Sequence, residues 1–199
     1  MMQRTEDKVI FYLMLTDRAS RGFTLIELMV TLSVAAILMM VAVPSYREFI
    51  QSNRMSTQVN LLLSDLNAAR SESVKRRVPV TLCKSANQTS CSSSGGYEQG
   101  WFIFVDHDRD GAVDNDDMIL RTQDATGTDL TIRGKTPIQN RISFFDSGNV
   151  STSGSIIFCD SRIQVFSTDR VKARAIIISQ PGRFRTVTGS DALVTSCGT

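Results

Sequence analysis

The sequence predicts an α+β fold, in which one long N-terminal helix packs on an antiparallel β-sheet domain and the first half of that helix is transmembrane. Three observations predict it: a continuous apolar run over 23–43, a periodic apolar pattern over 46–74, and a series of short β-rich segments after Pro79. A single helix followed by consecutive strands is typical of α+β proteins. With 199 residues and 42% hydrophobic side chains, the chain can bury a core and is too apolar to be disordered throughout.

The overall charge and the histidine content exclude several classes of function. The formal net charge is +2, from 22 Lys and Arg against 20 Asp and Glu, and this excludes a polybasic nucleic-acid binder. His107 is the single histidine, so a multi-histidine metal centre is excluded. No Cys or Ser stands near it in sequence as a nucleophile partner. We therefore expect an exposed loop histidine and a protein that is not an enzyme.

The apolar run over 23–43 contains one charged residue, Glu27. A helix of this length spans roughly 30 Å, the thickness of the hydrocarbon core of a bilayer. The apolar region of a secretory signal is usually only about 7–15 residues long, and a core helix that is apolar on every side needs a larger protein to cover it. A membrane segment is therefore predicted. Arg18 and Arg21 precede it, which places that side in the cytoplasm and the rest of the chain outside it.

The start of this run carries a recognisable motif, Arg21-Gly22-Phe23-Thr24-Leu25-Ile26-Glu27-Leu28-Met29, with Pro44 further along. It resembles the class III signal of type IV pilins and type II secretion pseudopilins. The resemblance implies that residues 1–22 are a prepilin leader, that prepilin peptidase cuts between Gly22 and Phe23, and that the new amino group of Phe23 is methylated. It also implies that Glu27 neutralises the Phe23 amine of a neighbouring subunit during assembly, because a buried charge needs an opposite charge nearby. Met1 and Met14 both remain open as the start of the leader.

The helix is expected to continue beyond the membrane segment and to cover 23–78. Between Tyr46 and Val74 apolar residues recur mostly at steps of three and four, which predicts an amphipathic helix with one face on a core. Pro44 should kink this helix without ending it. Three basic residues, Lys75, Arg76 and Arg77, favour the helix dipole in the last turn, and Val78-Pro79 then ends the helix.

Residues 79–199 are predicted to form a β-rich domain in the periplasm. Short segments rich in β-branched and aromatic residues alternate there with Gly, Asn, Asp and Ser, as expected of strands and turns. The expected strands are Pro79–Cys83, Trp101–Val105, Met118–Arg121, Leu130–Ile132, Arg141–Phe145, Ser155–Phe158, Ile163–Phe166, Arg174–Ser179 and Thr186–Val187.

This part of the chain also resembles the GspH/FimT family of the type IV pilin superfamily. The residues that carry the resemblance are the helix end 68–76, the segments 80–83 and 100–106 with Asp110-Gly111, and Gly182-Arg183-Phe184-Arg185. The resemblance implies a type IV pilin fold and a minor type IV pilin of the FimT/FimU kind. Such a pilin would insert in the inner membrane and then enter a cell-surface pilus. A GspH-like minor pseudopilin of a type II secretion system is the alternative. The implied partners are other major and minor pilins along the N-terminal helix, prepilin peptidase and the pilus assembly platform.

Four cysteines lie outside the membrane segment, at Cys83, Cys91, Cys159 and Cys197. They allow three pairings, and no two have the CxxC spacing of a zinc-ligand pair. A periplasmic location favours disulfides. We predict a Cys83–Cys91 bridge that closes a short loop and a Cys159–Cys197 bridge that ties down the tail.

An acidic loop over 106–117 fits the calcium-loop spacing D-x-D-x-D-G with a carboxylate at the twelfth position. The candidate calcium ligands are the side chains of Asp106, Asp108, Asp110, Asp114 and Asp117, with the Ala112 carbonyl. No other cofactor is expected. Two features weaken the calcium hypothesis: Asp reaches less far than the usual Glu at position twelve, and the flanking segments look like strands rather than helices. The alternative is an Asp- and Gly-rich hairpin turn, a common turn composition.

Charge is distributed unevenly, because residues 83–120 hold two basic and seven acidic groups and residues 161–199 hold six basic and two acidic groups. In the basic region Arg183 and Arg185 flank Phe184 next to a Pro-Gly turn. Two guanidiniums on one side of an extended segment could contact successive phosphates, and solvated surface arginines are the alternative. The Gly-Arg-x-Arg motif resembles the one that FimT-type pilins use to bind DNA in natural transformation. The resemblance implies DNA contacts by Arg183 and Arg185, with Lys172 and Arg174 as weaker additions.

Overall fold

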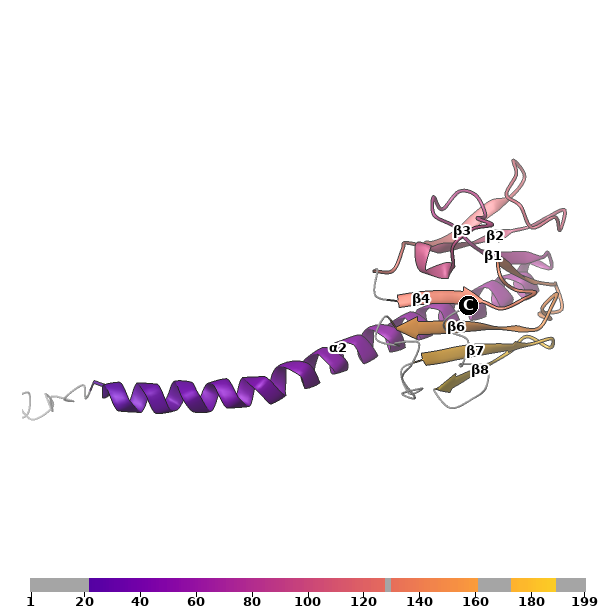
Figure 1. The fold of residues 1–199 in the computed structure, drawn as a ribbon. Coiled ribbons are helices and arrows are strands. Elements are labelled where there is room, and N and C mark those ends of the chain that lie inside the picture. Colours follow the sequence, from indigo (N-terminus) through magenta and orange to yellow (C-terminus); the bar gives the residue numbers. More distant parts are fainter. Residues whose placement is uncertain (1–21, 128–129, 161–172, 189–199) are drawn as a thin grey trace, which may run out of the picture. The chain divides into compact units, whose positions relative to one another are not determined.

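The computed structural model describes residues 22–127, 130–160 and 173–188. The described part contains one long helix, α2 (Leu25–Arg76), a short 3-10 helix, η1 (Tyr97–Gln99), and strands in two antiparallel sheets (Figure 1). The first sheet has the order β3-β2-β1-β5, from β1 (Val80–Lys84), β2 (Trp101–Val105), β3 (Met118–Gln123) and β5 (Arg141–Phe144). The second has the order β4-β6-β7-β8, from β4 (Leu130–Gly134), β6 (Gly154–Asp160), β7 (Ala173–Ser179) and β8 (Arg183–Thr188).

These elements confirm the predicted α+β class, a long N-terminal helix on an antiparallel β-domain, with the difference that the strands divide between two sheets. The expected strand Ile163–Phe166 lies outside the described residues. The chain forms two compact units, Met1–Tyr46 and Arg47–Thr199, and α2 contributes to both.

In the first unit, α2 begins with a side-chain cap. The backbone N–H of Glu27 donates to the Thr24 hydroxyl at 3.3 Å, which satisfies one of the free donors of the first turn. The polar residues of the apolar run are satisfied within the helix: Thr31 Oγ1 donates to the Leu28 carbonyl and Ser33 Oγ to the Met29 carbonyl, at 2.9 and 2.8 Å. The apolar side chains of this stretch are exposed, and α2 has the length and composition to cross a membrane. The helix runs through Pro44 without ending there.

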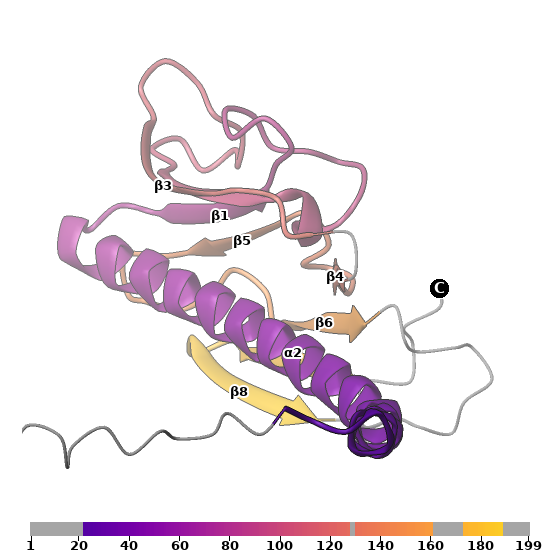
Figure 2. The same ribbon diagram turned by 90° about the vertical axis from the view of Figure 1, so that its left-hand side faces the viewer.

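In the second unit, α2 buries one stripe of side chains at helical spacing: Met55, Val59, Leu62, Asp65, Leu66, Ala69 and Ser73. The apolar members of this stripe share one core with residues of both sheets, among them Leu82, Trp101, Ile156 and Ile176. Figure 2 shows this part of α2 running across both sheets. The helix ends at Arg76, because Arg77 takes a left-handed conformation with φ of 58°, a common way to end a helix.

The register of the first sheet determines where the acidic loop lies. β1 pairs with β2 from Val80↔Val105 to Lys84↔Trp101, and β2 pairs with β3. A bulge shifts the β2–β3 register between Ile103 and Phe104. Residues 106–117 therefore connect two neighbouring antiparallel strands, so the segments that flank the loop are strands, as the sequence predicted.

Candidate functional site

The predicted processing junction lies just before the long helix. Gly22 and Phe23 are exposed and non-helical, and the Phe23 side chain is 80% exposed. Exposed segments outside regular structure are the usual substrates of proteases. Glu27 stands one turn further on, in the first turn of α2. The other residues of the predicted leader lie outside the described residues.

One of the two predicted cysteine pairs lies entirely within the described residues. Cys83 at the end of β1 and Cys91 in the following loop form a disulfide, with their Cα atoms 5.6 Å apart. The two cysteines pack with Phe102, Phe104 and Val113 into a small apolar cluster, so the bridge fastens the loop after β1 to the first sheet. Cys159 is also disulfide-bonded, and Cys197, the partner that we predict for it, lies outside the described residues.

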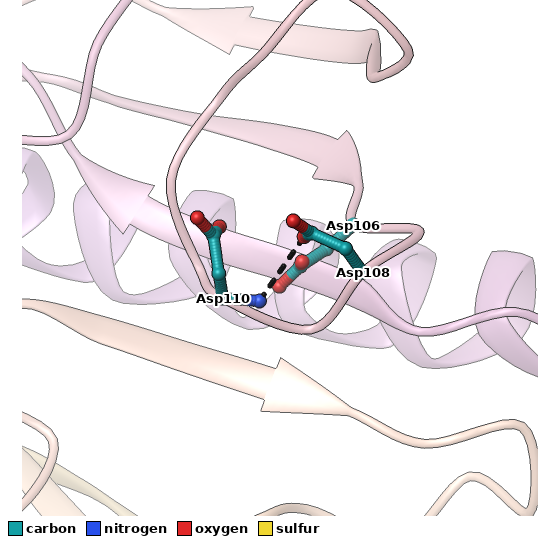
Figure 3. A group of neighbouring side chains, drawn as sticks. All are labelled: Asp106, Asp108 and Asp110. Atoms are coloured by element: carbon teal, nitrogen blue, oxygen red, sulfur yellow. Dashed lines mark hydrogen bonds between the residues drawn. The ribbon is translucent and has the colours of Figure 1, made fainter.

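The acidic loop brings three of its five candidate calcium ligands together (Figure 3). One carboxylate oxygen each of Asp106, Asp108 and Asp110 lies within 4.8 Å of the others. Asp106 is buried, and it accepts hydrogen bonds from the Thr81 hydroxyl at 2.8 Å and from the Gly111 N–H at 3.4 Å. The exposed Asp108 accepts from the Asp110 N–H at 3.2 Å.

The other two candidate ligands do not join this group. Asp117 accepts from the backbone N–H groups of His107 and Asp114, at 3.1 and 3.3 Å, and so closes the loop on itself. The guanidinium of Arg141 donates to the Gly111 carbonyl at 3.1 Å and places a positive charge beside the loop. These contacts favour the hairpin-turn interpretation, and calcium binding stays a prediction. The His107 side chain is half exposed, with Nδ1 3.6 Å from the Asp117 carboxylate.

The β7–β8 hairpin places Arg183 and Arg185 on one face of the second sheet. Three residues, 180–182, join the strands, and the Gly182 N–H donates to the Ser179 carbonyl at 2.8 Å. Arg183 pairs with Ser179 and Arg185 with Ile177, and both arginines are exposed. Phe184 faces the other way and meets the Phe144 ring edge-on, with the ring centroids 6.1 Å apart. The two arginines are therefore neighbours on one face of β8, and Phe184 packs the opposite face of the strand against Phe144.

Arg174 does not belong to this arginine pair. In β7 it pairs with Phe158 and Thr188, in the row of side chains that includes the buried Ile176 and Ile178. Because side chains alternate along a strand, Arg174 points to the opposite face of the sheet from Arg183 and Arg185. Arg174 therefore does not share the face of Arg183 and Arg185, and a weaker DNA contact by Arg174 stays a prediction. Lys172 lies outside the described residues.

Sequence reasoning missed Arg70, which fixes the hairpin turn to the helix. From α2, its Nε donates to the Gly148 carbonyl at 3.0 Å and its Nη2 to the Pro181 carbonyl at 3.3 Å. Gly182 has a φ of 71°, and a Cβ there would lie 2.3 Å from the Gly148 oxygen and 2.8 Å from Arg70 Nε. The glycine of the Gly-Arg-x-Arg motif is thus required by packing. The only sequence signal for Arg70 was its place in the family-like segment 68–76.

Comparison with protein families gives two matches. The family model described as Type II transport protein GspH matches residues 58–182. The family model for the prokaryotic N-terminal methylation motif matches residues 17–43. No curated protein sequence matches this chain.

Solved structures give a matching fold. A crystal structure of the type IV minor pilin FimU from Pseudomonas aeruginosa strain PAO1 has a TM-score of 0.54 and 22% identity, over 72% of this chain and 95% of FimU. A second crystal form of FimU has a TM-score of 0.50 and 22% identity, over 68% and 94% of the two chains. The minor pseudopilin EpsH of the type 2 secretion system of Vibrio cholerae has a TM-score of 0.46 and 8% identity, over 69% of this chain and 99% of EpsH. The likeness to FimU shows a type IV pilin-like fold.

The family match covers more than half of the chain, and the methylation motif ends at Val43, within the apolar part of α2. Together they are consistent with an inner-membrane prepilin whose domain lies in the periplasm. Proteins of this kind are structural subunits and not enzymes. The chain belongs to the GspH family and is a minor type IV pilin or pseudopilin with an N-terminal methylation motif.

Proposed function

We propose that this chain is a minor pilin of a type IV pilus, cleaved after Gly22 and held in the inner membrane by the first part of α2 until it enters the filament. The proposal rests on the structure at the start of α2. An exposed Gly22–Phe23 junction leads directly into a capped helix whose apolar side chains are exposed. Such a surface requires a bilayer or the helices of other subunits to cover it.

Glu27 is the assembly residue of this proposal. It is the single charged residue of the apolar run, and a carboxylate in the bilayer core costs several kcal/mol unless it has a partner. The free amine of Phe23 on a neighbouring subunit is a cation of the right kind. Because Glu27 lies only one turn into the helix, a neighbouring subunit needs little axial displacement to bring its Phe23 amine opposite Glu27.

Mass spectrometry of the protein from sheared filaments tests this assignment. We expect a mature chain that begins with N-methylated Phe23. The Glu27→Gln variant should still lose its leader but should be absent from the filament fraction. Glu27→Asp, which keeps the charge, is the matched control. An intact leader in the filament-associated protein would contradict the proposal.

The alternative is a minor pseudopilin, because the GspH family fits both assignments. Deletion of the gene separates them: loss of pili with normal secretion supports the pilus, and loss of secretion with normal pili supports the pseudopilus.

A second candidate function is DNA binding by Arg183 and Arg185. Their exposure on one face of β8 favours it, since residues two apart on a strand stand about 6.6 Å apart and can each contact a phosphate. We expect Arg183→Gln with Arg185→Gln to weaken DNA binding at low salt by about tenfold or more and to reduce its salt dependence. Arg174→Gln, on the other face of the sheet, is the matched control. Unchanged mobility-shift binding by the double variant would remove this function.

A further inference from the structure

The two sheets leave four edge strands, and two of these are covered by other parts of the chain. At β4 the Glu98 carboxylate accepts the Ile132 N–H at 2.8 Å and contacts the Arg133 guanidinium at 2.9 Å. At β5 the Ser151 N–H donates to the Ser143 carbonyl at 2.9 Å, and Val150 bridges to Phe144. Covered edges of this kind prevent another chain from adding a strand. The third, β8, leads into residues outside the described part.

The fourth edge strand, β3, is open. Within the described residues, its backbone hydrogen bonds run to β2 only, and no strand pairs with its other side. Its apolar side chains are unusually exposed, at 45% for Met118 and 38% for Ile119. The one charge of the strand, Arg121, has a 57% exposed side chain, and its guanidinium contacts the Asp65 carboxylate of α2 at 3.1 Å. Figure 1 shows β3 as the outermost strand of its sheet.

The charge beside this edge indicates what could pair with it. The loop that leads into Met118 carries six aspartates and one arginine over 106–117, and Asp108, Asp110, Asp114 and Asp116 are exposed. A strand added to β3 would have one end against these carboxylates. A basic residue at that end is favoured by their field, and an acidic one is disfavoured.

We infer that β3 is a strand-addition surface for an extended segment of a neighbouring pilin subunit, with apolar side chains over Met118 and Ile119 and a Lys or Arg beside the acidic loop. Main-chain hydrogen bonds would provide the affinity and the charge would set the register, as in other cases of β-augmentation. The inference rests on the proposed function, because assembly in a filament brings the domains of other subunits within reach.

Photo-crosslinking in filaments tests the inference. The full chain carries a photo-reactive amino acid at Thr122, an exposed residue of β3, and the same probe at Thr131 on the covered strand β4 is the control. We expect the Thr122 probe to crosslink to a strand of another pilin subunit that carries a Lys or Arg about four residues from the crosslinked position, toward the acidic loop. The Thr131 probe should give no such product. Ile119→Lys places a cation next to the basic end of the added strand and should lower the crosslink yield at least fivefold. Ile119→Val should preserve the yield.

The same samples separate this inference from the proposed function. Leader removal and recovery in sheared filaments report on the pilin assignment, and the crosslink reports on β3. If the chain is processed and recovered in filaments but the Thr122 probe captures no pilin strand, or Ile119→Lys leaves the yield unchanged, the inference about β3 is wrong and the pilin assignment stands. Asp114→Lys with Asp116→Lys should also lower the yield, and an unchanged yield in that variant would overturn the assigned charge preference.

Discussion

Asp65 is a carboxylate on the buried face of α2, and it joins three elements. It is 6% exposed and accepts the indole N–H of Trp101 in β2 at 2.8 Å and the Arg121 guanidinium in β3 at 3.1 Å. Asp65→Ala leaves the buried indole donor without a partner, so we expect the free energy of unfolding to fall by about 2–3 kcal/mol. Urea denaturation of the detergent-solubilised chain measures it.

Two comparisons isolate that contact. Asp116→Ala, an exposed loop substitution, should change stability by less than about 0.5 kcal/mol. Trp101→Phe should cost less when Asp65 is already Ala than when it is Asp, because the lost hydrogen bond is shared. Equal costs in both backgrounds would show that the contact does not stabilise the fold.

Lys84 gives a pH-dependent prediction. It is buried at the end of β1, and its ammonium donates to the Gly95 carbonyl at 2.8 Å. Burial away from water, with Arg133 nearby, lowers the pKa of Lys84 below its ordinary value of 10.5. Between the two pKa values the unfolded chain binds more protons than the folded one, so stability rises with pH in that window.

The stability difference between the native chain and Lys84→Met isolates this effect from other titrating groups. We expect the free energy of unfolding of the native chain to rise relative to that of the variant between pH 7 and pH 10. Urea denaturation at several pH values measures this difference. A difference that stays constant over this range would show that the ammonium is as well solvated in the folded chain as in the unfolded one.

Gly182 combines backbone conformation with close packing. Its φ of 71° disfavours any residue with a Cβ, and a Cβ would collide with the Gly148 carbonyl. We expect Gly182→Ala to lower the free energy of unfolding by about 1–3 kcal/mol. Gly127→Ala is the matched control, because nothing lies within 4 Å of a Cβ there. Thermal unfolding of both variants checks the prediction, and equal melting temperatures would contradict it.

At the scale of elements, the sequence predicted the helix face and the strands that follow from the local spacing of apolar residues. The steps from Met55 to Ala69 keep one side of a helix apolar, and these residues are buried. Segments such as Trp101–Val105 were recognised because a strand buried on both faces is a continuous apolar run. Strand partners could not be predicted. β4 precedes β5 in the chain but joins the other sheet, since pairing depends on contacts between distant segments.

The same limit explains which parts of the candidate site were predicted. Arg183 and Arg185 are two apart on one strand, so alternation alone places them together. Arg174 is on another strand, and its face depends on the β7–β8 register, which pairs it with Thr188. Arg70 contacts Gly148 and Pro181 through tertiary packing, and no spacing in the sequence indicates such contacts.

The disulfide is an element-scale constraint, because it closes the loop after β1. Cys83 and Cys91 are eight residues apart, and the chain-entropy model gives about 2–3 kcal/mol for a loop of this size. We expect Cys83→Ala with Cys91→Ala to lose roughly that amount in urea denaturation under oxidising conditions. Addition of a reductant should lower the stability of the native chain further than that of the variant. A variant as stable as the native chain would show that packing with Phe102 and Phe104 already holds the loop.

At the scale of the whole molecule, the near-neutral net charge of +2 conceals two separate charged surfaces. The acidic loop belongs to the first sheet, and Arg183 and Arg185 belong to the last strand of the second. Both sheets share one core with α2, so the two charged surfaces are held by one folded unit. Charge reversal at one surface can therefore be tested without altering the other, and this makes the proposed DNA and β3 contacts separable by mutation.

The part of the chain after Tyr46 has the features of a unit that folds by itself. All buried residues of α2 lie at or after Met55, whereas the apolar residues before Arg47 are exposed. Residues 47–199 also form a compact unit of their own. We therefore expect a chain that begins at Arg47 to be soluble and folded, with a melting temperature within about 3 °C of the full chain in detergent.

A shorter chain that begins at Leu63 provides the contrast. It lacks Met55, Val59 and Leu62, and each buried side chain of this size is worth about 2–5 kcal/mol, so their joint loss approaches the whole stability of a domain. We expect this chain to be unfolded in circular dichroism. If the chain from Arg47 is unfolded as well, the membrane part of α2 is needed for folding and the two units are not independent. If the chain from Leu63 has the same melting temperature as the chain from Arg47, the buried residues Met55, Val59 and Leu62 do not stabilise the domain.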